Sequence, residues 1–245
     1  MLHSYIHHIT RVIYITQFAP SGVIVHTMYM LATNKQQQDL VKVFKRGTRL
    51  TFKKGEYVIR PGETPSGVFF IEKGLVKAYD ISKYGEENLL IIRKDQEIFP
   101  LIWALTGQER DIIYEAMDDL VVWRISRKDY LKEIHGSKDL LMVMFTMTIE
   151  MYRLHSEHIL NLEYRTVRER LICFLLNTSE RFGEPHKDGS ITLTVPLKQQ
   201  DIASSINSTR ETTGREMTRL ERLGLVTAKQ GKINLLNPAG LRATL

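Results

Sequence analysis

The sequence predicts an α+β fold in which an antiparallel β-roll precedes a long helix and a C-terminal winged helix-turn-helix. Three observations support this prediction. Glycines recur at strand-plus-turn spacing through the first half of the chain, as they do in sandwiches and barrels. An apolar heptad pattern then runs through residues 137–163, which is typical of a long helix with a packed seam. Finally, residues 197–236 contain two short helical segments, a tight turn and a hairpin pattern.

Length and composition narrow the class of protein. A chain of 245 residues exceeds one average domain, so we expect two. The single cysteine, Cys173, excludes an intrachain disulfide, cysteine-based structural zinc sites and any iron–sulfur cluster held by four cysteines of one chain. No run of about 18 apolar residues occurs, so no membrane span is expected. With 34 Lys and Arg against 28 Asp and Glu, the net charge is +6, which favours an anionic partner.

Residues 1–33 read as an N-terminal extension without a clear pattern. Its apolar residues are interrupted by five basic or imidazole side chains: His3, His7, His8, Arg11 and His26. This interruption argues against an export signal, so a cytoplasmic location is expected. The early histidines permit a metal-site interpretation, but a loose or partly helical extension is favoured. Met28 or Met30 is an alternative start that would place residues 1–27 outside the natural protein, because patterned sequence begins near Asn34.

The predicted β-roll covers residues 48–126. Its turns are marked by five glycines: Gly55, Gly62, Gly67, Gly74 and Gly85. Pro61 and Gly62 predict a type II turn, because proline pre-sets φ and glycine accepts the positive φ of the next position. The apolar run 68–71 suits a buried strand, whereas residues 75–79 alternate more openly. Further strands are expected at 88–92, 112–116 and 120–126. Such a barrel either holds a small ligand in its interior or is simply packed there.

A short helix over residues 129–134 is followed by a long one over residues 137–163. The seam of the long helix has alternating spacings of four and three: Leu140, Met144, Met147, Met151, Leu154, His158 and Asn161. This helix would be about 40 Å long, and no other segment could cover it on all sides. We therefore expect a parallel helix from a second copy, hence a homodimer. The alternative is one amphipathic helix lying on the barrel. His155 and His158 are interpreted as interface histidines rather than as a pH sensor or metal ligands.

The last third of the chain predicts a winged helix-turn-helix. A helix over residues 166–182 and a strand over 191–195 come first. Residues 199–206 then form a short helix, and Asn207 can adopt the left-handed conformation that a tight interhelical turn requires. A second helix opens at residues 208–211, and residues 225–236 form a hairpin.

The second of these helices carries side chains suited to DNA. Arg210 and Arg215 can each donate two parallel hydrogen bonds to guanine, and Glu211 can accept one from cytosine. The start of this helix and the residues near it are suited to binding DNA phosphates. We expect four polar side chains to contact phosphates there: Gln199, Gln200, Thr209 and Thr212. Two alternatives stand beside this interpretation. Ser208-x-x-Glu211 is also a capping box, in which Glu211 only caps its helix, and the arginines could be plain solvated charges.

The chain resembles the Crp/Fnr family of bacterial transcription regulators. The resemblance covers residues 48–236 and rests on five motifs: Gly55-Glu56, Pro61-Gly62-Glu63, Phe69-Phe70-Ile71-Glu72-Lys73-Gly74, Gln108-Glu109-Arg110 and Thr209-Arg210-Glu211-Thr212-Thr213-Gly214-Arg215. It implies a cyclic-nucleotide-binding-like jelly roll as the sensor domain (34–136), a dimerisation helix (137–165) and a DNA-binding domain (166–245). It further implies a homodimer on double-stranded DNA with inverted-repeat TGTGA-type half-sites, and RNA polymerase as a partner.

The effector pocket departs from the family pattern. In members that bind cyclic nucleotides, glycine and glutamate occupy the positions of Phe99 and Pro100, and a small residue follows the phosphate-binding arginine. Arg110 matches that arginine, but Asp111 follows it, and a carboxylate there would repel phosphate and could neutralise Arg110. Cyclic AMP is therefore not expected to bind, no other cofactor is predicted, and the effector is not identified.

Two other classes of function are weaker. A cyclic-nucleotide-binding-like scaffold that regulates a partner protein without reading DNA has no use for exposed arginines on a recognition helix. An enzyme is not predicted, because no phosphate-binding loop, nucleophile elbow, dinucleotide-binding turn or metal-spaced histidine pair occurs.

Overall fold

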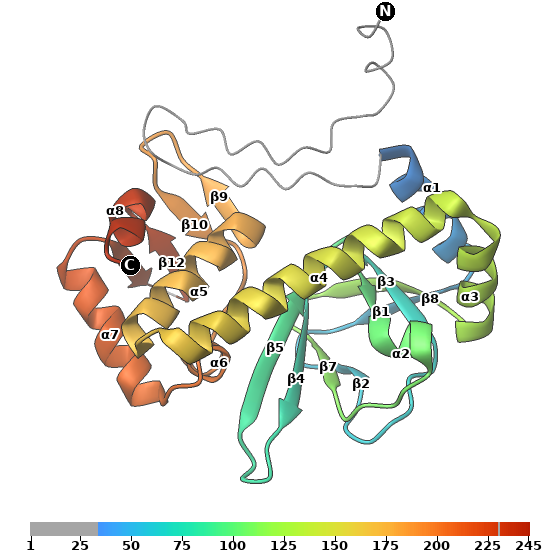
Figure 1. Cartoon of the computed structure of the whole chain (residues 1–245), viewed down its shortest axis with the longest axis horizontal. Helices are drawn as coiled ribbons and strands as arrows, with labels where there is room; N and C mark the ends of the chain where they lie inside the picture. The colour runs from blue at the N-terminus through green and yellow to red at the C-terminus, as the bar shows by residue number, and fades with distance from the viewer. Residues whose placement is uncertain (1–33, 230) are drawn as a thin grey trace, which may run out of the picture.

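The computed structural model describes residues 34–229 and 231–245. The expectations for residues 1–33, including the early histidines and the alternative starting methionines, lie outside the described residues. Within the described part, a sheet-rich first domain and a C-terminal domain are joined by one long helix that crosses the molecule (Figure 1). The fold class is the α+β class that the sequence predicts.

Two four-stranded antiparallel sheets form the β-roll. The first has the order β1-β8-β3-β6: β1 (Thr48–Phe52), β8 (Leu120–Ile125), β3 (Val68–Lys73) and β6 (Ile98–Phe99). The second has the order β2-β7-β4-β5: β2 (Tyr57–Ile59), β7 (Ile113–Ala116), β4 (Val76–Ile81) and β5 (Glu87–Arg93). Both sheets contribute to one apolar core: Ile59, Phe69, Ile71, Val76, Phe99, Ala116, Leu120 and Val122. The turn predicted at Pro61 and Gly62 is present, with a φ of 72° at Gly62.

Helices cover the outer face of the first sheet. Successive strand residues point to opposite faces, so Phe69 lies in the roll whereas Phe70 packs outward on Phe44, with ring centroids 5.4 Å apart. Phe44 belongs to α1 (Asn34–Phe44), and Tyr130 of α3 (Arg127–Gly136) joins the same cluster. A short helix, α2 (Leu101–Thr106), follows β6.

The long helix is α4 (Lys138–Tyr164), close to the range that the heptad pattern predicts. The Ser137 hydroxyl caps its start by accepting a hydrogen bond from the Leu140 amide. From there α4 runs along the roll to the C-terminal domain (Figure 1), packing first on α1 and α3 and later on α5.

The predicted dimer seam faces the chain's own first domain. Leu140 and Met144 are only 4% and 2% exposed, because they pack into the cluster of α1, α3 and the outer sheet face. Met147 and Met151 pack against the same cluster, and Leu154 and His158 lie half-buried on the same side of the helix. The seam assignment was thus wrong for Leu140 and Met144, and the alternative of a helix lying on the barrel describes this face.

The opposite face of α4 is apolar and exposed. Eight large hydrophobic side chains lie on it: Leu141, Met142, Phe145, Ile149, Tyr152, Ile159, Leu160 and Tyr164. Leu141 and Phe145 are both 54% exposed. At about 100° of rotation per residue, these side chains centre on the side of α4 opposite Met147. The chain itself leaves this stripe uncovered within the described residues.

The C-terminal domain packs four helices on a small sheet. Its strands have the order β11-β12-β10-β9: β11 (Val226–Lys229), β12 (Lys232–Leu235), β10 (Ile191–Leu193) and β9 (Gly183–Pro185). The helices are α5 (Val167–Phe182), α6 (Gln199–Ser205), α7 (Arg210–Arg222) and α8 (Pro238–Ala243). Thr166 and Glu169 form a capping box at the start of α5. Among the described helices, none is both long and apolar enough to cross a membrane.

Hydrogen bonds join the C-terminal domain to the roll at α6 and at the end of α5. The first places α6 on β5, where the Ser204 hydroxyl lies 3.4 Å from the Leu89 amide that donates to it. The second lies at the end of α5, where Arg181 donates to Glu97 at 2.8 Å. Lys94 also donates to the Arg181 carbonyl at 3.1 Å. The β5–β6 turn is therefore bonded directly to the C-terminal domain.

Candidate nucleic-acid interface

A tight turn sets the angle between α6 and α7. Asn207 has a φ of 48°, the left-handed conformation that the sequence predicts, and the Ser208 amide donates to the Ala203 carbonyl at 3.0 Å. Ala203 is fully buried, so its small side chain lets the two helices pack closely. These features confirm the predicted helix-turn-helix.

The inner face of α7 fastens it to the domain core. Thr213, Met217 and Leu220 are buried, and the Thr213 hydroxyl has no hydrogen-bond partner among the described residues. Glu216 accepts from Arg168 of α5 at 2.8 Å. The sequence did not predict this ion pair, because the two residues are far apart in the sequence and no motif links them.

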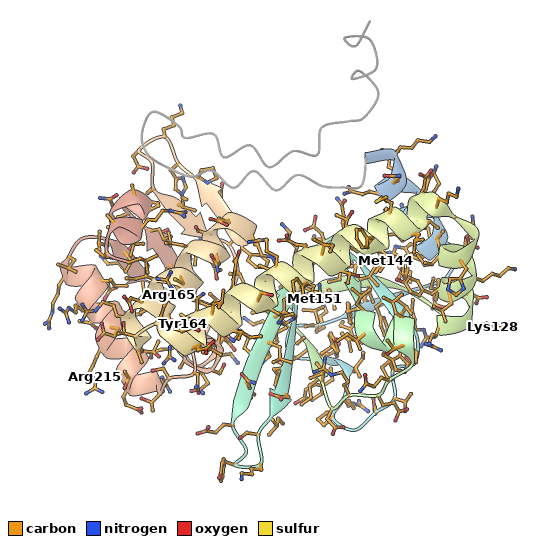
Figure 2. All side chains as sticks on the ribbon, viewed as in Figure 1. Lys128, Met144, Met151, Tyr164, Arg165 and Arg215 are labelled. Atoms are coloured by element: carbon orange, nitrogen blue, oxygen red, sulfur yellow. The ribbon has the colours of Figure 1, made fainter. Side chains whose placement is uncertain are left out.

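The outer face of α7 presents the predicted base-reading residues to solvent. Arg210, Glu211 and Arg215 are all exposed, and Figure 2 shows Arg215 projecting from α7 away from the rest of the molecule. The N-terminus of this helix carries the positive end of its dipole, which adds to the two arginine charges. The face is therefore suited to an anionic surface.

Hydrogen bonds link most of the predicted phosphate-contacting residues to the arginines. Thr209 and Thr212 share a hydroxyl hydrogen bond of 3.0 Å, and the Thr212 hydroxyl accepts from Arg215 at 3.0 Å. The Arg210 Nε donates to Gln199 at 3.4 Å. Gln200 is exposed beside Gln199 on α6. The start of α6 and the first turns of α7 thus form one continuous polar surface.

Gly214 leaves room for the Gln199 side chain. A β-carbon at position 214 would lie 2.5 Å from the Gln199 side-chain nitrogen, so any other residue would displace Gln199. Sequence reasoning placed Gly214 on the outer face but did not predict this close approach.

Glu211 does not cap its helix. The helix begins at Arg210, one residue later than a Ser208 cap requires, and the Thr209 hydroxyl caps it by accepting from the Thr212 amide at 3.1 Å. Of the two interpretations of Glu211, the capping box is therefore contradicted. Its carboxylate is exposed and available to a ligand.

The wing follows α7 and packs against it. Its strands, β11 and β12, are paired from Val226 to Leu235, and Lys229 and Lys232 near its tip are exposed. The chain from Pro196 onward holds eight basic and four acidic residues, so most of the excess positive charge of the protein belongs to this domain.

The roll interior differs from a nucleotide pocket. Phe99 is fully buried and stacks on Phe69 and Tyr114, with ring centroids 5.2 and 4.9 Å apart, so aromatic rings fill the space that a glycine would leave. Burial raises the pKa of the Tyr114 phenol. Pro100 precedes α2, and Arg110 and Asp111 are exposed. Asp111 could have neutralised Arg110, but the two form no ion pair among the described residues.

The part of the chain that the structure describes holds no cluster of three metal-ligating side chains. Cys173 is buried in α5, and burial raises the pKa of its thiol. It therefore lies in the core of the domain rather than on the exposed face.

Comparison with known proteins assigns both halves of the chain. A family model described as a cyclic nucleotide-binding domain matches residues 49–136, and one described as a Crp-like helix-turn-helix domain matches residues 169–244. The global nitrogen regulator of Nostoc sp. strain PCC 7120 is 30% identical over 193 residues, which are 78% of this chain and 86% of that protein. The global nitrogen regulator of Synechocystis sp. is 29% identical and covers 84% of this chain.

A solved structure agrees. A transcriptional regulator of the CRP/FNR family from Thermus thermophilus superposes with a TM-score of 0.63 at 25% identity, covering 80% of this chain and 97% of that one. The β-roll and the helix-turn-helix occur in the order in which the two family models match, and the long helix lies between the two matched ranges. The chain belongs to the Crp/Fnr family of transcription regulators.

Proposed function

We propose that this regulator acts as a homodimer that binds double-stranded DNA, with one α7 helix in the major groove of each of two inverted half-sites. The observation that carries the proposal is the exposed row of Arg210, Glu211 and Arg215 on a helix whose inner face is buried. The half-sites would lie about 34 Å apart, one helical turn of DNA. By family resemblance, the complex acts on RNA polymerase in the cytoplasm.

The exposed side chains divide into base-reading and backbone-binding roles. Each arginine can donate a bidentate pair to the O6 and N7 of guanine, and Glu211 can accept from the N4 of cytosine. The hydrogen bond from Arg215 to Thr212 restrains that guanidinium before DNA arrives. Thr209, Thr212, Gln199 and Gln200 surround the helix start, where contacts go to phosphates and set the position of the protein without reading sequence.

The exposed stripe on α4 supports the homodimer. Apolar patches rimmed by polar residues mark interaction surfaces, and this stripe extends along most of a helix of 27 residues. Its members replace the predicted seam and include Leu141, Phe145, Tyr152 and Ile159. Two copies joined along this stripe would place two α7 helices on one side of the dimer, as paired half-sites require.

The packing of Phe99 supports the expectation that cyclic AMP is not the effector. A nucleotide would have to displace a ring that is fully buried between Phe69 and Tyr114. Truncating a buried aromatic side chain to alanine lowers the free energy of unfolding by about 3–5 kcal/mol. Moving the Phe99 ring out of its site is expected to be similarly costly.

The test is selection of preferred sites from random duplexes, followed by binding to single-base variants at fixed salt. Arg215→Ala and Arg210→Ala should each weaken binding by about 1–3 kcal/mol and relax preference at one guanine. Glu211→Ala should change preference at one cytosine. Arg222→Ala is the matched control, because Arg222 is exposed in the last turn of the same helix and should leave base preference unchanged.

Fixed salt matters, because phosphate contacts alone change affinity by orders of magnitude with ionic strength. Thr212→Ala should weaken binding to all sequences about equally. If base preference is unchanged in both arginine variants, base reading by this face is refuted and the scaffold alternative becomes the better explanation.

A further inference from the structure

A cavity of about 400 Å³ lies outside the roll, between α1, the outer face of the first sheet and α4. Its apolar wall includes Leu40 and Val41 of α1, Phe70 and Ile98 of the sheet, and Met147 and Met151 of α4. Its volume falls within the range of small-molecule sites. It is a different place from the pocket that the family pattern marks, since none of Phe99, Pro100, Arg110 and Asp111 lines it.

One end of the cavity carries a buried guanidinium with unused donors. Arg93 is 8% exposed. Its Nη1 donates to Glu97 at 3.2 Å, and its Nη2 faces the Met151 sulfur at 2.6 Å, but thioether sulfur is only a weak acceptor. Its Nε is buried without a hydrogen-bond partner among the described residues. Nε and Nη2 form one edge of the guanidinium, so that edge has no strong acceptor.

The charge at this end favours an anion. Glu97 also accepts from Arg181, so one carboxylate is shared between two guanidinium groups. Two other carboxylates of the lining have cationic partners of their own: half-buried Glu150 pairs with Arg153, and exposed Glu180 pairs with Arg242. Asp95 is exposed at the turn. A buried donor without an acceptor is costly, and an arginine edge matches the two oxygens of a carboxylate.

We propose that this cavity binds a monocarboxylate with an apolar body. The carboxylate accepts hydrogen bonds from the Arg93 Nε and Nη2, in place of the Met151 sulfur, and the apolar body lies between α1 and α4 against the methionines. Methionine side chains are flexible and adapt to ligands of different shape. The site is separate from the DNA-binding face, and its test uses no DNA, so either proposal can fail without the other.

The test uses octanoate and 4-phenylbutyrate, each labelled with ¹³C at the carboxyl carbon, and titrates them into the full chain by NMR and calorimetry. We expect saturable binding of at least one acid. Binding of 1-octanol, which has the same apolar body without the carboxylate, should be about tenfold weaker or more, because charge-assisted hydrogen bonds are lost.

Two variants locate the site. Arg93→Lys keeps the charge but lacks the two-donor edge, and should weaken binding about tenfold or more. Met147→Trp fills the cavity without removing a hydrogen bond, and should also abolish binding; it decides the matter if Arg93→Lys does not fold. Arg110→Gln, in the pocket marked by the family pattern, is the matched control and should bind as the parent does.

Three results would overturn the proposal. They are no saturable binding of either acid, full binding in folded Met147→Trp protein, or loss of binding in Arg110→Gln with retention in Met147→Trp. The last would place the ligand inside the roll.

Discussion

The two faces of α4 have similar side chains and opposite environments. The inner face holds Leu140 and Met144, which the first domain buries almost completely, whereas Leu141 and Phe145, one residue further along, are 54% exposed. Both faces repeat at heptad-like spacing. The difference lies in what covers them: α1, α3 and a sheet cover one face, and no described residue covers the other stripe.

This contrast shows what periodicity can decide. A pattern of apolar residues establishes that a helix has a packed side, but it does not say whether the packing partner belongs to the same chain. When a helix is apolar on two sides, two apolar patterns lie one residue apart in the sequence. Choosing one pattern rather than the other then decides which face is assigned to the core and which to a partner. The comparison therefore predicts opposite consequences for neighbouring substitutions.

The largest effect is expected from a charge on the outer face. Phe145→Glu should give a folded monomer, because the dimer would bury that carboxylate without a partner. Affinity for a two-half-site duplex should then fall by about 10²–10⁴-fold, the loss expected when two linked contacts become independent. Light scattering gives the mass, and circular dichroism verifies the fold. The control is Lys128→Gln, which changes the net charge by the same amount. Lys128 is exposed on α3 (Figure 2). A dimeric Phe145→Glu protein would contradict this role for the outer face.

The next effect concerns the inner face. Met144→Ala should lower the free energy of unfolding by about 2–5 kcal/mol, because it leaves a cavity in a filled cluster. It also removes the sulfur that accepts a hydrogen bond from Tyr130 at 2.8 Å. Urea unfolding in the Phe145→Glu background measures this without a contribution from dimer dissociation. Met142→Ala, on the exposed side, should cost much less there. Equal costs would show that the two faces are not distinguished as described.

Much of the fold was accessible from the sequence. The turn at Gly62, the long helix and the helix-turn-helix each depend on local pattern, and local pattern determines them. The side of α4 that faces the roll was not accessible, since it depends on α1 and on the outer sheet face, which are distant in sequence. Local pattern suggested a Ser208 cap, whereas the adjacent hydroxyl-bearing residue, Thr209, caps α7.

The candidate site divides in the same way. The exposure of Arg210, Glu211 and Arg215 followed from helical periodicity alone. The hydrogen bond from Arg210 to Gln199 and the ion pair of Arg168 with Glu216 join different helices, so only the assembled domain reveals them. The sequence showed Phe99 at a position where nucleotide-binding members have glycine, but its stacking between Phe69 and Tyr114 depends on the pairing of strands.

A smaller effect should arise where the two faces meet. Arg153 lies between them and pairs with Glu150 at 2.8 Å and with Glu157 at 2.6 Å. Arg153→Ala should lower the free energy of unfolding by about 0.5–1 kcal/mol, since each helical pair of this kind contributes a few tenths. Raising the salt concentration should shrink the difference. A double-mutant cycle with Glu157→Gln isolates one pair, and a coupling of zero at low salt would contradict its contribution.

The smallest effect is a pH dependence on the inner face. Burial lowers the pKa of His158 below its ordinary value of 6.5, and the nearby positive charge of Arg170 lowers it further. Burial lowers the pKa of His155 as well, and the positive charges of Arg93, His158 and Arg110 lower it further.

The unfolded chain therefore binds protons more readily than the folded one. The stability that the neutral imidazoles contribute is fully present above pH 6.5 and is lost as the pH falls from there toward the folded-state pKa. In the Phe145→Glu background, the free energy of unfolding should fall as the pH drops below about 6.5, and His158→Gln should reduce that slope. His135→Gln, on the exposed surface of α3, controls for loss of an imidazole elsewhere. A slope that is unchanged in His158→Gln would mean that this part of α4 is more open to water than the inner face described here, and the contrast between the two faces would then end before residue 158.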